Sequence, residues 1–205
     1  MSIFFSSDVH LGHANIIKFC DREFDSVEDM NEILIENWNK TVKQNDFIYF
    51  LGDLTMSKKK VAEYLDRLNG KIHFIYGNHD RSTRKIIKNH KNVISAKDLM
   101  VMNINKQAIT LCHYAMRVWN KSHYGAIHCY GHSHGTIPPY KNSMDVGVDS
   151  AFQLLGEYRP FSLEEVLYYT SEEGSYEVKE VIYEYVEYLY QTLGKQLELE
   201  ELTDE

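Results

Sequence analysis

Short apolar segments that alternate with helical patterns constrain the fold of this chain more than any other feature of its sequence. Residues 3–7, 47–51 and 71–76 have the length of strands, and the second is a continuous apolar run. Such a run is typical of a strand buried on both faces. Helical patterns cover residues 26–42 and 57–68. Strands that alternate with helices predict a layered α/β sheet with right-handed crossovers.

In the second half of the chain, strand patterns no longer alternate regularly with helical patterns. A short polar turn at residues 105–107 separates two apolar segments, which predicts a hairpin. Strand patterns continue after the hairpin, and a short helix precedes it. The expected elements are a helix at 82–89, hairpin strands at 99–104 and 108–112, and further strands at 126–130 and near 144–148.

An acidic segment with a helical pattern ends the chain. A helix-cap signal at Ser162 starts a shorter helix before it. We predict one domain over residues 1–170 and a helical, acidic extension over residues 171–205, packed on or extending that domain. An apolar stripe on the extension is expected to pack on the core, and the alternative is a homodimer interface. The stripe consists of Val178, Val181, Ile182, Tyr185, Val186 and Leu189.

Size and charge exclude several classes of protein. The 205 residues suffice for one well-cored domain. Lys and Arg number 22 against 30 Asp and Glu, and this balance argues against duplex nucleic acid as a partner. No apolar run approaches the roughly 18 residues that span a bilayer, so we expect no membrane partner. The start lacks a signal-peptide pattern and the three cysteines are an odd count, so we predict a cytoplasmic protein.

Metal-capable side chains follow five of the predicted strands, at the point where each strand ends. In an open α/β sheet, sites form beyond the carboxyl ends of the strands, so these side chains are expected to meet. Imidazole and carboxylate ligands suit Zn, Mn, Fe, Co or Ni, and a structural zinc finger would need a set of cysteines. The residues are Asp8, His10, Asp53, Asn78, His79, His113, His132 and His134.

Taken in order, these strand-end motifs resemble the calcineurin-like metallophosphoesterases. The resemblance covers roughly residues 3 to 150 and implies a four-layer α/β/β/α sandwich with mixed sheets and with metals at one edge. The motifs that carry it are Asp8-Val9-His10, Gly52-Asp53, Gly77-Asn78-His79-Asp80, His113 and Gly131-His132-Ser133-His134.

The resemblance also implies a binuclear centre with two divalent ions, which would be Mn, Fe, Zn, Co or Ni, with Mn favoured. Asp53 would bridge the two ions through its two oxygens. His79 would be the catalytic histidine, and Asp80 would fix the tautomer and orientation of its ring. The implied ligand sets are Asp8, His10, Asp53 and His134 for one ion, and Asp53, Asn78, His113 and His132 for the other.

The implied activity is the hydrolysis of phosphate diesters, phosphate monoesters or both by a hydroxide shared between the metals. The expected substrate is a small nucleotide-like or other phosphorylated compound. Two alternatives are a non-catalytic metal-binding scaffold and a nuclease that acts on nucleic-acid ends. The complete ligand set together with His79 argues against the scaffold. The negative net charge argues against the nuclease.

Four further residues are candidates for binding the substrate. His13 lies just past the first metal loop, where it could touch substrate or have no function. Arg22, Arg81 and Arg117 could each hold a phosphate through a bidentate fork. For each arginine, the alternative is a salt bridge at the surface.

Overall fold

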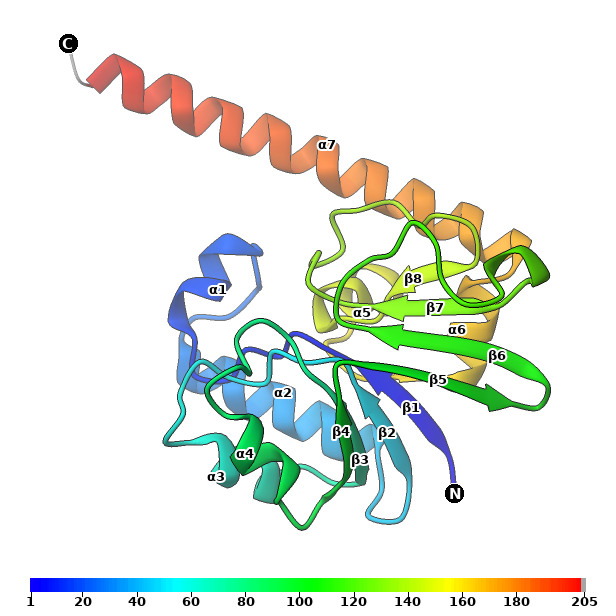
Figure 1. Ribbon diagram of the computed structural model, residues 1–205. Helices are drawn as coiled ribbons and strands as arrows, with labels where there is room; N and C mark the ends of the chain where they lie inside the picture. The colour runs from blue at the N-terminus through cyan, green and yellow to red at the C-terminus, as the bar shows by residue number, and fades with distance from the viewer. Residues whose placement is uncertain (204–205) are drawn as a thin grey trace.

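Two sheets pack against each other, with helices around them, in the computed structural model (Figure 1). The structure describes residues 1–203, apart from the side chains of Tyr176 and of residues 193–203. Both sheets contain parallel and antiparallel pairs of strands. The expected α/β fold, a sandwich of two mixed sheets with helices, is confirmed.

The first sheet has five strands in the order β4-β3-β2-β1-β9, all parallel except β9. Three helices, α2, α3 and α4, cover one of its faces and enclose the first apolar core. Helix α2 begins where Ser26 Oγ accepts a hydrogen bond from the Asp29 amide, as its capping pattern predicts. The bounds are β1 (Ile3–Ser6), β2 (Phe47–Phe50), β3 (Lys71–Ile75), β4 (Val93–Lys97), β9 (Phe161–Ser162), α2 (Val27–Thr41), α3 (Val61–Arg67) and α4 (Arg84–Lys88).

The second sheet has the order β5-β6-β7-β8. The predicted hairpin forms β5 and β6, and Asn105 and Lys106 turn the chain with φ angles of 50° and 71°. A second core lies where this sheet meets β1, and helices α6 and α7 contribute to it. The bounds are β5 (Leu99–Ile104), β6 (Gln107–Cys112), β7 (Ile127–Tyr130), β8 (Ser143–Asp145), α6 (Leu163–Tyr169) and α7 (Glu172–Thr203).

Several short elements differ from the expectations. The strand expected near residues 144–148 ends at Asp145, and helix α5 (Val148–Leu155) begins directly after it. The short helix α1 (Ala14–Phe19) and the edge strand β4 were not expected. Each of these elements is too short to show a clear period in the sequence.

Helix α7 packs on α5 and α6, and then runs on past α1 (Figure 1). Val178 and Ile182 from the predicted stripe are buried in the second core, while Val186 is partly buried against it. The boundary near residue 170 and a homodimer through α7 stay predictions. Within the described part of the chain, no helix has both the length and the apolar character needed to cross a membrane.

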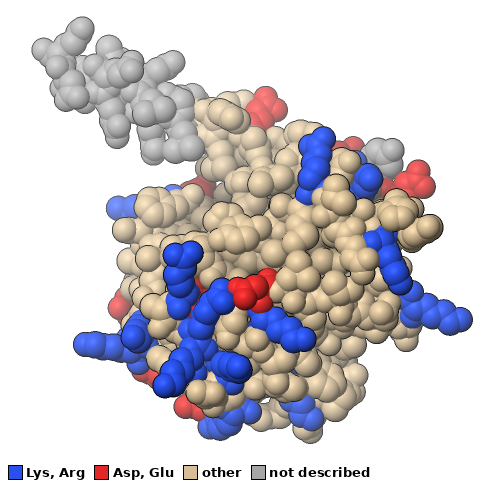
Figure 2. Space-filling view, viewed as in Figure 1, with Lys and Arg blue, Asp and Glu red and all other residues tan. Residues whose placement is uncertain are grey.

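Basic side chains are unevenly spread over the surface. Lys and Arg gather mainly at the lower left of Figure 2, over α3 and α4, and are sparse on the central face. On the face that Figure 2 shows, the positive charge therefore lies mostly toward one end.

Candidate metal centre

The loops that follow five strands meet at one edge of the two sheets, and these loops carry all seven predicted ligands. The first sheet supplies the loops after β1, β2 and β3, and the second sheet supplies those after β6 and β7. Backbone hydrogen bonds join them: the Asp8 amide donates to Gly52 O at 3.0 Å, and the Gly131 amide donates to His113 O at 2.9 Å. The strand-end rule thus predicts which side chains meet.

Asp53 lies at the middle of the cluster. Its Oδ2 lies 3.8 Å from His10 Nε2, 3.5 Å from His113 Nε2 and 3.8 Å from His79 Nε2. Its Oδ1 accepts a hydrogen bond from the His79 amide at 2.9 Å, which fixes the carboxylate plane. One oxygen of Asp53, Oδ2, therefore faces imidazoles from both sheets, whereas the expected bridge used both oxygens and Oδ1 is taken up by the His79 amide.

The two carboxylate oxygens of Asp8 also have different surroundings: one is hydrogen-bonded to the protein and the other faces the site. Its Oδ2 accepts hydrogen bonds from Ser7 Oγ at 2.5 Å and from the His132 amide at 2.8 Å. Its Oδ1 lies 3.6 Å from His10 Nε2 and is buried without a hydrogen-bond partner among the described residues. Burial alone would raise the pKa of Asp8, but the neighbouring imidazoles of His10 and His134 hold it well below its ordinary value.

The unpartnered buried atoms show that these residues fit divalent ions. Both ring nitrogens of His10 are buried without a partner among the described residues, as is Asp8 Oδ1. Buried polar atoms almost always have a partner, because leaving one unsatisfied is costly. Two groups of residues offer oxygen and imidazole ligands that could hold an ion. Within each group, the ligand atoms all lie within 4.8 Å of one another. The groups are Asp8, His10 and His134, and Asp53, His113 and His132, with Asn78 Oδ1 3.0 Å from His113 Nε2.

The backbone of the ligand loops is strained. Five of the seven predicted ligands have left-handed φ angles, a conformation that costs about 1–3 kcal/mol for a residue with a side chain. Such strain persists only where the surrounding structure imposes it, and it is concentrated at functional sites. The angles are 57° at Asp8, 49° at His10, 58° at Asp53, 67° at His132 and 49° at His134.

Asp149, which the sequence analysis missed, holds His134 in place. Nδ1 of His134 donates to Asp149 Oδ2 at 2.6 Å. Burial alone would lower the pKa of His134, but the Asp149 carboxylate outweighs it and raises the pKa to about 11. Burial alone would raise the pKa of Asp149, but Arg22 and His134 lower it to about 2. A carboxylate behind a ligating imidazole fixes the ring orientation and its tautomer.

Arg22 is the partner of Asp149, which corrects its expected role as a substrate contact. Its Nε and Nη2 donate to the two Asp149 oxygens at 2.7 and 2.8 Å. The remaining donors bind Asp8 O at 2.7 Å, Val9 O at 3.1 Å and the Met30 sulfur at 3.5 Å. The side chain is fully buried and has no donor left for a phosphate. Arg22 instead ties the first ligand loop to α5.

Asp145 is a second buried carboxylate that the sequence analysis missed. It accepts hydrogen bonds from Ser133 Oγ at 2.5 Å and from the Gly135 amide at 3.1 Å, and thereby supports the loop that carries His132 and His134. Burial and the nearby Asp8 raise its pKa to about 6. Asp145 is the last residue of β8 and Asp149 lies at the start of α5, which follows it, so the rule that found the ligands could also have indicated these residues.

Asp80 also differs from its expected role. Its Oδ2 accepts hydrogen bonds from the amides of Asp53 at 2.8 Å and Gly77 at 2.9 Å. Among the described residues, no hydrogen bond joins its carboxylate to the His79 ring. The Asp80 side chain therefore holds two ligand loops together, and the His79 ring, about one-third exposed, faces the site beside His10.

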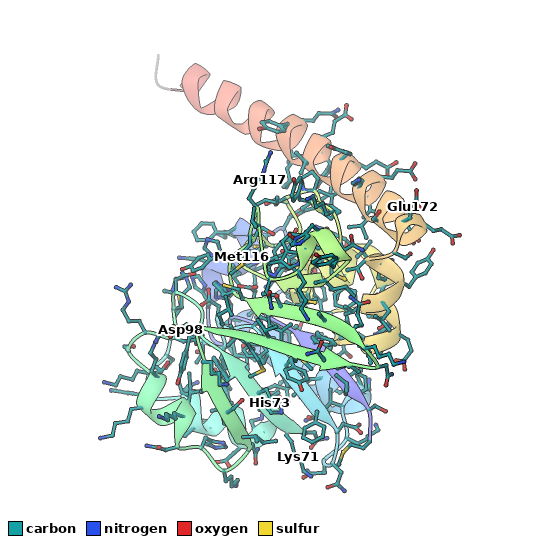
Figure 3. The ribbon with its side chains drawn as sticks, turned by 45° about the vertical axis from the view of Figure 1, so that its right-hand side comes forward. Lys71, His73, Asp98, Met116, Arg117 and Glu172 are labelled. Atoms are coloured by element: carbon teal, nitrogen blue, oxygen red, sulfur yellow. The ribbon has the colours of Figure 1, made fainter. Side chains whose placement is uncertain are left out.

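The other three predicted substrate contacts occupy different places. His13 is half-buried beside His10, with ring centroids 5.7 Å apart, and burial lowers its pKa. Arg81 is exposed and lines a separate cavity with Asn78 and other residues. Arg117 points outward from the loop after β6, with its guanidinium 4.9 Å from the Tyr140 ring (Figure 3). Their contact with substrate stays a prediction.

Comparison with known proteins identifies the family. Residues 1–146 match the model of the calcineurin-like phosphoesterase superfamily domain. The chain belongs to this superfamily. Its members are generally phosphoester hydrolases and typically bind divalent metals. The resemblance inferred from the motifs is thus confirmed.

Several known proteins are similar to this chain. An uncharacterized protein of Methanocaldococcus jannaschii, MJ1445, is 38% identical over 172 residues, which cover 79% of this chain and 87% of that protein. The gene 66 protein of Mycobacterium phage D29 is 32% identical over 84 residues, or 39% of this chain and 41% of that protein. A solved structure, the protein of unknown function AQ665 from Aquifex aeolicus, has a TM-score of 0.60 at 20% identity, over 80% of this chain and 97% of that one.

Proposed function

We propose that this protein is a metal-dependent hydrolase of phosphate esters, acting on diesters, monoesters or both in small phosphorylated compounds. The observation that carries the proposal is the position of Asp53, whose Oδ2 lies between His10 of one ligand group and His113 of the other. A carboxylate oxygen placed between two imidazole-containing groups suits a pair of cations better than one. Membership of the superfamily supports the same activity.

The proposed ligands divide between the two ions as the motifs imply, with Asp53 shared and Mn favoured. Ligand sets of this kind also accept Fe, Zn, Co or Ni. When bound, two divalent ions supply Lewis acidity, which stabilises charge on phosphoryl oxygens and lowers the pKa of water to near neutral. The proposed sets are Asp8, His10, Asp53 and His134, and Asp53, Asn78, His113 and His132. Three members of each set, Asp8, His10 and His134, and Asp53, His113 and His132, have ligand atoms within 4.8 Å of one another.

His79 is the residue proposed to act on the substrate directly. Its backbone amide is fixed by Asp53 Oδ1, while its ring remains about one-third exposed toward the site. From this position the imidazole donates a hydrogen bond to a phosphoryl oxygen or a proton to the leaving oxygen. Asp80 contributes indirectly, because its carboxylate holds the backbone of Asp53 and Gly77.

The test is hydrolysis of bis-p-nitrophenyl phosphate and p-nitrophenyl phosphate by protein treated with EDTA and then supplied with Mn²⁺. We expect activity to disappear with EDTA and to return with Mn²⁺, and the ratio of the two rates separates diesterase from monoesterase activity. Metal content, measured in parallel by mass spectrometry, should be two ions per chain. A chain that binds two ions yet hydrolyses neither compound would favour a scaffold, and failure to bind two ions would contradict the binuclear centre.

A further inference from the structure

A pocket of about 710 Å³ opens directly onto the proposed metal ligands. Its lining includes His10, Asp53 and His79, so a molecule in the pocket lies beside the reacting groups. The volume is in the range of sites that enclose a small organic ligand. The pocket is thus large enough for more than a phosphoryl group.

Apolar side chains from three separate segments line the pocket. Phe19 at the end of α1 is 72% exposed, Met56 after β2 is 53% exposed, and Ile137 after β7 is 48% exposed. One exposed apolar residue needs no explanation, but several that converge on a cleft mark a binding surface. Ile16 of α1 adds a buried apolar side chain to the same lining.

Helix α7 adds Tyr185 and Leu189 to the apolar side of the pocket. We call this side, formed by Ile16, Phe19, Met56, Ile137, Tyr185 and Leu189, the apolar wall. Tyr185 Oη donates to Cys20 O at 3.1 Å, and Tyr188 Oη donates to Asp21 Oδ2 at 3.1 Å. These bonds hold α7 against the loop after α1, which places Tyr185 and Leu189 in the lining of the pocket. Helix α7 lies beyond residues 1–146, so its part of the apolar wall is an addition to the matched domain.

The charges of the residues that line the pocket indicate which kind of ligand it can bind. Among the described residues that line the pocket, none is Lys or Arg. Basic side chains gather instead over α3 and α4, at the lower left of Figure 2. A second phosphate would therefore lack the cationic partners that usually bind it. The metal ions would balance one phosphoryl group, and the rest of the pocket favours an uncharged group.

We propose that this pocket selects phosphate esters with a single phosphoryl group and an uncharged, apolar or aromatic organic part, which packs between α1 and α7. The inference rests on the proposed phosphoesterase function and names its substrate class. The phosphoryl group lies at the proposed ligands, and the organic part contacts Phe19, Tyr185 and Leu189. Substrates with several phosphates, such as nucleoside triphosphates, are disfavoured.

Two diesters with the same leaving group test this selection. Phenyl p-nitrophenyl phosphate and methyl p-nitrophenyl phosphate release the same nitrophenolate, so their rates differ through the retained group. We expect kcat/KM of the Mn²⁺-loaded protein to be at least about tenfold higher for the phenyl ester, mainly through KM, since one methylene in an apolar pocket gives 10–200-fold. Equal kcat/KM values for the two esters would overturn the inference and leave the proposed function intact.

Substitutions on α7 test whether this helix causes the preference for the phenyl ester. Leu189→Ser should bring the phenyl-to-methyl ratio of kcat/KM down by about threefold or more, because it removes apolar contact with the retained group. Tyr183→Ser is the matched control: Tyr183 is on the same helix and 60% exposed, does not line the pocket, and should leave both rates unchanged. Circular dichroism verifies that both variants keep their helix content. A ratio unchanged in Leu189→Ser would contradict a role for α7.

Measuring the binding of phosphonates tests the apolar wall independently of the proposed hydrolytic function. Calorimetric titration of the metal-loaded protein with phenylphosphonate and methylphosphonate needs no turnover. Tighter binding of phenylphosphonate that is lost in Leu189→Ser would support the apolar wall even where neither ester is hydrolysed. Absence of hydrolysis would count against the proposed function, and equal affinity for the two phosphonates would count against the wall.

Discussion

Asp149 accepts a hydrogen bond from Nδ1 of His134 at 2.6 Å, which leaves Nε2 as the ring nitrogen available to a metal ion. Both oxygens of Asp149 are in turn held by the buried guanidinium of Arg22. The three residues form a buried chain that ends at a proposed ligand. Metal affinity should therefore depend on a residue that does not itself need to bind the metal.

Asp149→Asn should weaken the binding of Mn²⁺ about 10- to 100-fold, because the amide no longer orients and polarises the His134 ring as a carboxylate does. Isothermal titration of the metal-free protein measures the affinity. Glu157→Gln is the control, since Glu157 is an exposed acid just beyond α5. Equal affinities in Asp149→Asn and the control would show that Asp149 does not position His134.

Arg22→Met should lower the free energy of unfolding by about 3–5 kcal/mol, because it leaves the Asp149 carboxylate buried with only His134 as a charged partner. Urea denaturation of the metal-free protein measures the loss. The double variant Arg22→Met/Asp149→Asn should lose less than the sum of the two single variants, because it leaves no uncompensated carboxylate. Strict additivity would mean that the two side chains do not stabilise each other.

Asp53→Ala and His79→Ala should separate metal binding from turnover. Loss of the shared carboxylate should abolish binding of the ion pair and activity together. His79→Ala should keep both ions while lowering kcat about 10²–10⁴-fold, the usual size of general acid–base catalysis. Metal content by mass spectrometry and kcat on bis-p-nitrophenyl phosphate are measured on the same samples. Loss of metal in His79→Ala would reassign His79 as a ligand.

The sequence predicts the main sheets and the cluster of proposed ligands because both depend on local signals. Each ligand follows a short apolar strand, and parallel strands bring such ends to one edge. Edge strand β4 was missed because its residues alternate weakly and are half-buried or exposed. Helix α1 was missed because it has six residues and no side-chain cap.

Partners distant in sequence account for the wrong interpretation of Arg22. An arginine fork suits a phosphate and a carboxylate equally, and Asp149 is 127 residues away. Asp80 presents the same difficulty, because adjacency to His79 suggests a contact, whereas its side chain turns to the backbone of Asp53 and Gly77. Local sequence identifies the chemistry of such groups, and only the packed chain selects their partner.

Gly77→Ala should disturb the centre far more than an alanine at an open glycine. A Cβ at Gly77 would lie 2.1 Å from Asp53 Oδ1, so the proposed bridging carboxylate would have to move. We expect loss of at least one metal ion and a destabilisation of about 1–3 kcal/mol. Gly125→Ala is the control: its Cβ meets nothing within 4 Å, and its φ of 78° costs about 1–2 kcal/mol without touching the centre. Full metal content in Gly77→Ala would show that Asp53 tolerates the displacement.

Asp80→Asn should change how the stability of the metal-free protein depends on pH. Burial, with a smaller contribution from Asp53, raises the pKa of Asp80 from 3.8 to about 6. Between these two values the folded state binds more protons than the unfolded state, so the free energy of unfolding falls as pH rises through the window and then levels off above about 6.

Asparagine does not ionise, so Asp80→Asn lacks this loss of stability. The free energy of unfolding of the variant relative to that of the wild type should increase by about 3 kcal/mol between pH 3.5 and pH 7. Urea denaturation at intervals across this range measures the difference. Asp25→Asn, at an exposed acid, is the control and should show no comparable trend. A difference between Asp80→Asn and the wild type that stays constant with pH would mean that the buried Asp80 carboxyl keeps its ordinary pKa.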